Sequence, residues 1–331
     1  MIITRTPFRI SFFGGGTDYP IWYKTNCGAV INTSINKYCY ITARYLPPFF
    51  DFKYRIRYYN KEETQTIDQI KHPAVRECLR FLEIENGVEI VHTADLPAQS
   101  GLGSSSTFTV GLLNSLFALK NYMPTKKELA LNAIHVEQEL IKENVGSQDQ
   151  TAAAFGGFNK IEFNGSKEIV VQPIIISPEK FELLQKHLLL FFTGYARNAN
   201  EIAGDQIKET PKKNKELKVI MNIVDEAYSI LRSNNGYFND FGRLLDEQWK
   251  IKRTLTSKIT NRLIDNIYES GKRAGAIGGK LLGAGGGGFI LFFADPDRHA
   301  SIKMKLKGLT HVPFRFDKTG SQIVYHSHDS D

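Results

Sequence analysis

A segment rich in glycine and serine, residues 97–106 with sequence PAQSGLGSSS, constrains the fold of this chain more than any other feature. It follows a strand-like apolar run at 88–92 and precedes residues 107–117, which are apolar enough to form a buried helix. Gly101 and Gly103 carry no side chains, so backbone N–H groups can close on a ligand there. The three serines that follow would stand in the first helical turn, where N–H groups are unpaired and the helix dipole is positive. The segment therefore predicts a strand–loop–helix unit that cradles an anion, and a triphosphate fits such a loop.

A helix that is merely capped after a glycine turn would show the same residues, and the GxxxxGK[ST] spacing of a Walker A loop is not found around them. Two further glycine-rich segments narrow the choice: residues 5–19 read RTPFRISFFGGGTDY, and residues 278–289 read GGKLLGAGGGGF. One such loop is weak support for a nucleotide site, whereas three in a fixed order over nearly the whole chain are strong support.

In order and separation, these three segments resemble the signature motifs of the GHMP kinases, the family named for galacto-, homoserine, mevalonate and phosphomevalonate kinases. Within that family, the GGGTD form of the first motif and the GSQDQ segment at 146–150 are most similar to bacterial D-glycero-D-manno-heptose 7-phosphate kinases. The resemblance implies an α+β fold in two domains: a ribosomal-S5-like, ATP-binding N-terminal domain over residues 1–186 and a ferredoxin-like C-terminal domain over 187–331. It also places the active site between the two domains.

Hydrophobic patterning by itself supports a two-layer α+β protein in two domains. Strands are expected at 8–13, 29–45 with a break, 54–59, 88–92, 156–163, 187–193 and 289–294, with two short ones at the chain end. Helices are expected at 74–82, 106–119, 125–143, 150–155, 198–208, 215–233, 237–255, 261–271 and 299–307.

The composition favours an enzyme of the cytoplasm. The 331 residues are 42% apolar and 23% charged, which is ordinary for a globular protein. The N-terminus lacks the apolar core and cleavage site of a signal peptide, and the longest apolar runs are too short to span a bilayer. Cys27, Cys39 and Cys78 show no metal-binding spacing and are expected to be reduced. We therefore expect no membrane partner, and a homodimer is compatible with the sequence.

The net charge of +7 is spread along the chain. Its densest run, residues 208–218, is interrupted by Pro211 and two glutamates and lacks stacking aromatic residues. Nucleic-acid binding is therefore the weakest of the functions considered, whereas a basic balance suits an enzyme whose ligands are phosphates.

The resemblance assigns the catalytic roles to Asp149 and Arg9. Asp149 matches the family aspartate that faces the acceptor hydroxyl, where a carboxylate can orient or deprotonate that group. Arg9 matches the basic residue of the first motif that pairs with this aspartate, and such a neighbour keeps a carboxylate ionised. From the residues alone, Asp149 could also cap the following helix, and Arg9 could be an exposed strand residue.

The resemblance also implies a magnesium site. Glu137 aligns with the family glutamate that binds the ion together with a serine of the second motif, for which Ser105 is the candidate. Magnesium takes few protein oxygens besides water and nucleotide phosphates, so one carboxylate and one hydroxyl would suffice. Glu137 could otherwise be surface charge, and Glu139, two residues on, is expected to face solvent.

The remaining site residues follow from the three motifs. GGGTD stands where related kinases read sugar hydroxyls, although a plain hairpin turn would also explain it, and its departure from the GEHTD pattern of galactokinases argues against galactose. The expected nucleotide contacts are Pro97, Ser100, Gly101, Leu102, Gly103, Ser104, Ser105, Ser106, Gly283, Gly285 and Gly286. The expected substrate contacts are Gly15, Gly16, Thr17, Asp18 and, for the phosphate of the substrate, Arg197, while Lys280 could reach a phosphate or the surface.

Together these inferences predict a kinase that uses ATP and Mg²⁺ to phosphorylate the anomeric hydroxyl of D-glycero-D-manno-heptose 7-phosphate, giving the 1,7-bisphosphate that feeds nucleotide-activated heptose synthesis. A kinase for C1 of a fucose- or galactose-type sugar is the first alternative. A catalytically silent protein that senses sugar and ATP is the second, because folds of this kind can bind both ligands without turnover.

Overall fold

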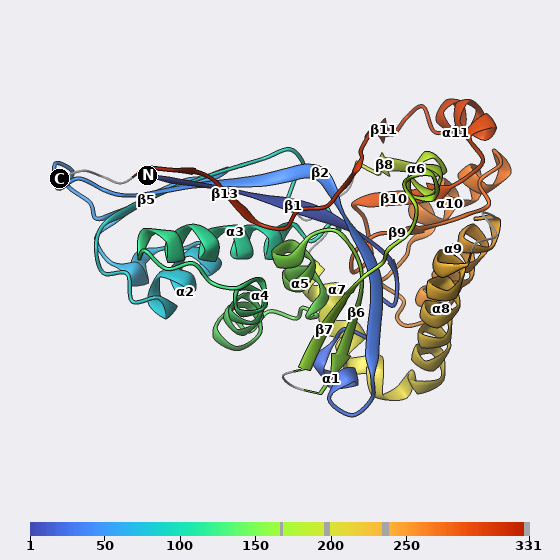
Figure 1. The fold of residues 1–331 in the computed structure, drawn as a ribbon, viewed down its shortest axis with the longest axis horizontal. Helices are drawn as coiled ribbons and strands as arrows, with labels where there is room; N and C mark the ends of the chain where they lie inside the picture. Colours follow the sequence, from blue (N-terminus) through green and yellow to red (C-terminus); the bar gives the residue numbers. More distant parts are fainter. Residues whose placement is uncertain (99, 166–167, 195–198, 234–237, 328–331) are drawn as a thin grey trace.

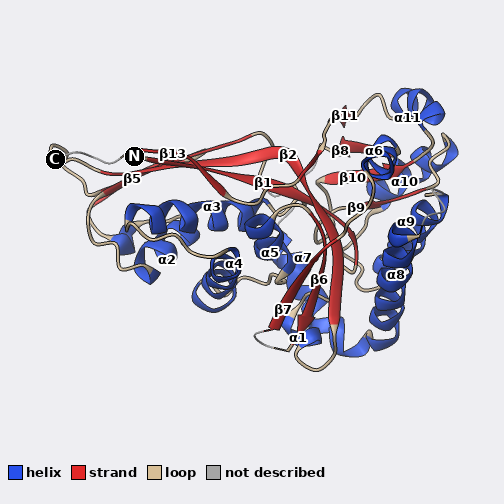
Figure 2. Cartoon of the chain, viewed as in Figure 1, coloured by secondary structure: helices blue, strands red, loops and turns tan. Residues whose placement is uncertain are grey.

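The computed structural model describes residues 1–98, 100–165, 168–194, 199–233 and 238–327, which fold into two sheets flanked by helices (Figure 1, Figure 2). Arg197, the predicted contact for the substrate phosphate, lies outside these residues. Within them, no helix is long and apolar enough to cross a membrane.

The first sheet is built around two long antiparallel strands, β1 (Ile2–Phe13) and β2 (Gly28–Tyr45). The predicted break in β2 is wrong: the strand is continuous but changes partner along its length. Residues 28–33 pair with β6 (Phe158–Asn164), and residues 39–45 pair with β5 (Val88–Ala94). The sheet is completed by β3 (Tyr54–Arg57), which runs parallel to β5, and by β4 (Lys61–Thr64), β7 (Glu168–Pro173), β12 (Phe316–Asp317) and β13 (Gln322–His326).

The pairing of β1 with β2 is irregular at two places, between Pro7 and Arg9 and between Ser11 and Phe13. Such bulges bend a strand and redirect its side chains, and they are frequent next to active sites. Arg9 and Ser11 both line the cavity described below, whereas Ile10 between them is fully buried in the core. The alternation of a strand thus separates the functional face of β1 from its packing face.

Helices cover one face of the first sheet, drawn below it in Figure 1. Among them α3 (Ser104–Leu119) packs against β1 and β2 and is buried along nearly its whole length. The helices α2 (Pro73–Phe81), α4 (Lys126–His135) and α5 (Gln148–Phe155) pack on its other sides. A helix enclosed in this way is apolar all round, which explains the composition of α3.

The helix expected at 125–143 has the predicted start but a different end. Thr125 and Glu128 form a reciprocal capping box, and α4 then runs to His135. A π-helical turn, Val136–Leu140, follows directly. It buries Glu137 completely and leaves Glu139 exposed, as expected for Glu139. Single π-helical turns within helices are frequent at functional sites.

The second sheet is antiparallel, with strand order β11-β8-β10-β9. Its strands are β8 (Leu188–Phe192), β9 (Gly278–Leu281), β10 (Phe289–Phe293) and β11 (Thr310–His311). The other helices described are α1 (Pro20–Tyr23), α6 (Pro178–Lys186), α7 (Ala199–Glu209), α8 (Asn214–Arg232), α9 (Asn239–Lys252), α10 (Arg262–Arg273) and α11 (His299–Lys305).

An aromatic junction packs between the two sheets. Phe12 and Phe13, at the end of β1, lie against Phe241 of α9 with ring centroids 5.5 and 4.9 Å apart. Phe241 in turn contacts Phe293 of β10, 5.9 Å away. The core therefore continues from the first sheet through α9 into the second, and it holds the C-terminal half of the chain in a defined place against β1.

The end of the chain returns to the first sheet. β12 pairs with β2, and β13 pairs with β1 (Figure 1). A domain boundary at residue 187 remains a prediction, and the last strands pack with the N-terminal half rather than with the second sheet.

Candidate active site

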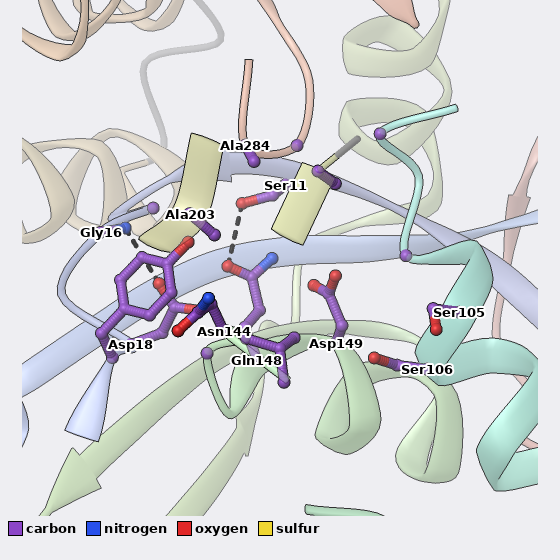
Figure 3. A pocket seen from close by; sticks show the side chains of 18 of the residues that line it. Ser11, Gly16, Asp18, Ser105, Ser106, Asn144, Gln148, Asp149, Ala203 and Ala284 are labelled. Atoms are coloured by element: carbon purple, nitrogen blue, oxygen red, sulfur yellow. Dashed lines mark hydrogen bonds between the residues drawn. The ribbon is translucent and has the colours of Figure 1, made fainter. Parts of the chain in front are cut away.

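The three glycine-rich segments meet around a cavity of about 150 Å³ (Figure 3). The start of α3 forms one end, where the side chains of Ser105 and Ser106 are drawn. Asp18 and Asn144 stand at the other end, and Asp149 projects between the two. The cavity thus offers an anion-binding end, a carboxylate in the middle and a polar end.

The anion-binding end is the start of α3. Gly103 adopts a left-handed backbone conformation with φ of 78°, and α3 begins at the next residue, Ser104. Gly103 and the serines at 104–106 line the cavity. The N–H groups of a first helical turn lack partners within the helix, and the dipole of the 16-residue α3 adds positive potential there. These are the physical requirements of a phosphate site.

The third glycine segment packs against the second, backbone to backbone. A Cβ atom on Gly101 would lie 2.5 Å from the carbonyl oxygen of Leu282, and one on Gly283 would lie 2.5 Å from Cα of Gly101. Further along, the N–H of Phe289 donates to the carbonyl of Ser100 at 3.1 Å. Residues with side chains would push the two loops apart, so the glycines set the shape of the anion site.

Not all predicted nucleotide contacts reach the cavity. Gly101, Gly103, Ser104, Ser105, Ser106 and Gly283 line it, whereas Pro97, Ser100, Leu102, Gly285 and Gly286 do not. Pro97 is exposed, and Leu102 is fully buried in the core. The N–H of Gly286 donates to the carbonyl of Ile259, which ties the third loop to the segment before α10. A nucleotide contact by these five residues stays a prediction.

Arg9 and Asp149 form a bidentate ion pair, as the resemblance implies. Nε and Nη2 of Arg9 donate to the two carboxylate oxygens of Asp149 at 2.7 and 2.8 Å, and Nη1 donates to the carbonyl of Gly101 at 2.9 Å. Arg9 is 4% exposed, whereas the side chain of Asp149 is 21% exposed and faces the cavity. The two parallel hydrogen bonds fix the carboxylate plane and link it to the phosphate loop.

Glu137 contacts a serine of the second motif, Ser106, whereas the sequence predicts the neighbouring Ser105 as the second magnesium ligand, which stays a prediction. The hydroxyl of Ser106 donates to Oε2 of Glu137 at 2.8 Å, and the amide of Gln150 donates to the same oxygen. Ser105 is exposed one residue earlier on α3, a rotation of about 100° around the helix. Glu137 does not itself line the cavity; it contacts Ser106, which does.

The environment of Glu137 is apolar enough to change its acidity. Burial raises the pKa of this carboxyl to about 7, and the hydrogen bonds that Oε2 accepts from Ser106 and Gln150 act in the opposite direction. Its second oxygen, Oε1, is buried without a hydrogen-bond partner in the described structure. A buried carboxylate oxygen in this state is ready to accept a cation or a donor.

The first glycine segment forms the polar end of the cavity. Oδ1 of Asp18 accepts from the N–H of Gly16 at 2.9 Å, and burial raises the pKa of Asp18. Gly15, Gly16 and Asp18 line the cavity, but Thr17 does not. The hydroxyl of Thr17 bonds to the backbone of Gly14 and Ala29, so Thr17 holds the turn in place and we drop it from the substrate contacts.

Two buried lysines of the C-terminal half also line the cavity. Nζ of Lys252, at the end of α9, donates to the carbonyl of Gly283 at 2.6 Å, and burial lowers the pKa of Lys252 to about 8. Lys280 donates to the carbonyl of Phe12 at 2.8 Å. It is 1% exposed and lines the cavity, so it faces the ligand space and not the surface. Sequence reasoning missed Lys252, because a lysine at a helix end is ordinarily a solvated charge.

Comparisons with known proteins decide the family. The profile of the GHMP kinases N terminal domain matches residues 70–157, and that of the GHMP kinases C terminal domain matches residues 230–307. The D-glycero-alpha-D-manno-heptose 7-phosphate kinase of Campylobacter jejuni is 31% identical over 96% of this chain and 97% of its own length. This chain belongs to the GHMP kinase family.

More distant GHMP kinases share the fold. The galactokinase of Pyrococcus furiosus is 26% identical over 91% of each chain. The crystal structure of a D-glycero-D-manno-heptose 1-phosphate kinase from Bacteroides thetaiotaomicron superposes with a TM-score of 0.75 at 24% identity, covering 99% of this chain and all of that one. The predicted α+β GHMP fold is therefore confirmed, and the protein is an ATP-dependent sugar kinase.

The packing of Gly101 against the third loop of this GHMP kinase leads to a first prediction. Gly101→Ala should weaken ATP binding at least about tenfold, equivalent to about 1.4 kcal/mol, because the added methyl group displaces the loop from Leu282. The affinity for ATP is measured by isothermal titration calorimetry.

Gly165→Ala is the matched control for this measurement. Its φ of +75° is close to the +81° of Gly101, but among the described residues, its chain neighbours aside, no atom lies within 4 Å of the added Cβ. Both variants carry the same backbone strain, and only Gly101→Ala carries the clash. Equal ATP affinities in the two variants would contradict this account of the loop.

Proposed function

We propose that this sugar kinase transfers the γ-phosphoryl group of ATP to the anomeric hydroxyl of D-glycero-D-manno-heptose 7-phosphate, giving the 1,7-bisphosphate for nucleotide-activated heptose synthesis. The observation that carries the proposal is the position of Asp149, held by Arg9 between the phosphate loop and the polar end of the cavity. The heptose assignment is supported by the Campylobacter jejuni relative, which is named as a kinase of that sugar phosphate.

The chemistry proceeds between the two ends of the cavity. The sugar oxygen attacks the γ-phosphorus as the bond from that phosphorus to the bridging oxygen of ADP breaks, and the hydroxyl proton passes to Asp149. Phosphoryl transfer of this kind depends mainly on positioning and charge neutralisation. Arg9 keeps the carboxylate oriented, and the N–H groups at the start of α3, with Lys252 nearby, supply positive potential.

Magnesium fits the residues next to the phosphate loop. Oε1 of Glu137 is buried without a partner in the described residues, and the hydroxyl of Ser106 lies beside the other oxygen of this carboxylate. Oxygen donors of this kind suit Mg²⁺, which retains its waters and the nucleotide phosphates. We propose that Glu137 and Ser106 hold the ion, with Ser105 at the exposed edge of the loop directed to the phosphates. The ion would neutralise charge on the transferring phosphoryl group.

The acceptor is tested by an ADP-release assay over a panel of free and phosphorylated hexoses and heptoses. A heptose 7-phosphate should give the highest kcat/KM, because the assignment rests on a relative acting on that sugar. A higher value for fucose or galactose would replace the heptose while leaving a sugar 1-kinase. No ADP release with any sugar, despite measurable ATP binding, would favour a silent sensor.

The role of Asp149 is tested by Asp149→Asn, which retains the size of the side chain but removes the charge and the proton acceptor. General-base help is worth roughly 10²–10⁴-fold in rate, so kcat should fall by that much while ATP affinity changes little. Asp68→Asn is the control. Asp68 also pairs with an arginine, Arg80, but it is exposed and does not line the cavity.

A fall in kcat of less than about tenfold would exclude a dominant base role and leave orientation by Arg9 as the explanation. Weaker ATP binding together with a lower melting temperature would instead identify Asp149 as a structural residue that acts through its ion pair with Arg9, since Ser147 is the N-cap of α5.

The metal assignment is tested by Glu137→Gln beside Glu139→Gln. Loss of the buried charge should lower kcat by about 10²-fold or more and raise the Mg²⁺ concentration needed for half-maximal rate. Glu139 is exposed two residues away, so its variant should behave like the wild type. An unchanged Mg²⁺ requirement in Glu137→Gln, with the circular dichroism spectrum preserved, would remove Glu137 from the metal site.

A further inference from the structure

Two side-chain N–H₂ groups are buried at the polar end of the cavity without hydrogen-bond partners among the described residues. Gln148 of α5 and Gln206 of α7 are each 3% exposed, and both line the cavity. In each, Nε2 is buried and has no partner within the described residues. A buried N–H₂ group that bonds to nothing loses its hydration without compensation, so such groups are uncommon unless a ligand completes them.

One face of α7 lines the cavity next to these amides. Ala199, Ala203 and Gln206 follow one another at intervals of four and three residues, so they share one face of the helix, and all three line the cavity. Figure 3 shows Ala203 directed into the same space as Gln148. The small side chains of Ala199 and Ala203 leave space beside Gln206. This face of α7 therefore forms a side of the cavity on which the amide of Gln206 is the hydrogen-bond donor.

Gln206 lies against the first glycine motif. A Cβ atom on Gly16 would be only 2.7 Å from Nε2 of Gln206, and the N–H of Gly16 donates to Asp18. The amide donor and the Asp18 carboxylate therefore both lie next to Gly16. The amide of Gln148 is held by Ser11, whose hydroxyl donates to Oε1 at 3.1 Å (Figure 3). Its Nε2 has no hydrogen-bond partner among the described residues.

We propose that Gln206 and Gln148 determine acceptor specificity by donating hydrogen bonds to hydroxyl oxygens of the sugar. The inference rests on the proposed sugar-kinase reaction but adds the residues that read the acceptor. A donor amide next to a carboxylate suits a hydroxyl group, which accepts from one and donates to the other. A site of this kind rejects an analogue that lacks the hydroxyl, because the buried amide is then left unpaired.

Gln206→Leu tests the proposal, because leucine fills a similar volume without a donor. The KM for D-glycero-D-manno-heptose 7-phosphate should rise about tenfold, with kcat and the KM for ATP within about twofold of the wild type. This pattern is expected when the lost contact binds the ground state and the transition state equally. Lys208→Leu is the control, an exposed residue two positions along the same helix. Gln206→Glu, which matches the shape but replaces the donor by a second carboxylate near Asp18, should raise the acceptor KM further.

A set of monodeoxy heptose 7-phosphates identifies the contact. The wild type should discriminate against one analogue by about tenfold or more, and Gln206→Leu should lose that discrimination while retaining it against the others. If the amide instead binds the phosphate, Gln206→Leu will lose its preference for heptose 7-phosphate over free heptose and discriminate among the deoxy sugars like the wild type, which overturns the hydroxyl assignment.

The outcomes separate this proposal from the assignment of the substrate. If the wild type releases no ADP with a heptose 7-phosphate, the heptose assignment fails, and the same variants are compared on the best acceptor of the panel. If the wild type accepts the heptose but Gln206→Leu and Gln206→Glu both retain its KM, with melting temperatures within about 2 °C of the wild type, the specificity role of Gln206 is overturned.

Discussion

The contact between Gly101 and Gly283 is the constraint on which the active site depends. At this point the phosphate loop of the first half and the glycine loop of the second half touch through their backbones, with no space for a side chain on either. The Phe12, Phe13 and Phe241 junction holds the two halves together nearby, so the approach of the loops is set by a packed core rather than by the loops themselves.

Burying charged side chains in the site costs desolvation free energy, which nearby hydrogen bonds offset. Arg9 is buried, but the three hydrogen bonds of its guanidinium group go to Asp149 and the phosphate loop, so one residue couples the acceptor side to the nucleotide side. Lys252 and Asp18 are also buried near the cavity. Burial lowers the pKa of Lys252 and raises the pKa of Asp18, because it disfavours the charged form of each group. Groups held in low dielectric act strongly on a transferring phosphoryl group, because no water must reorient during the reaction.

The predictions that succeeded concern residues whose neighbours in sequence already define their geometry. The glycines and serines before α3 predict a loop followed by a helix start, and the structure has both. Which serine bonds to Glu137, here Ser106, depends on the phase of α3 and on the π-helical turn at Val136–Leu140, and hydrophobic spacing reveals neither. Gln206 and Lys252 were missed for a similar reason: each lies in an ordinary amphipathic helix, and only the packing of that helix against the first glycine motif brings it to the cavity.

The sequence by itself determined the family, the α+β class, the three loops and the pairing of Arg9 with Asp149, because each of these is encoded in a short motif or its resemblance to known motifs. Tertiary structure alone decided that the last strands return to β1 and β2, that Thr17 holds a turn instead of facing the substrate, and that the face of α7 carrying Gln206 closes the polar end of the cavity. These outcomes depend on contacts between residues far apart in the chain. Such contacts are selected by the total burial and hydrogen bonding of the folded molecule, which no local pattern of residues specifies.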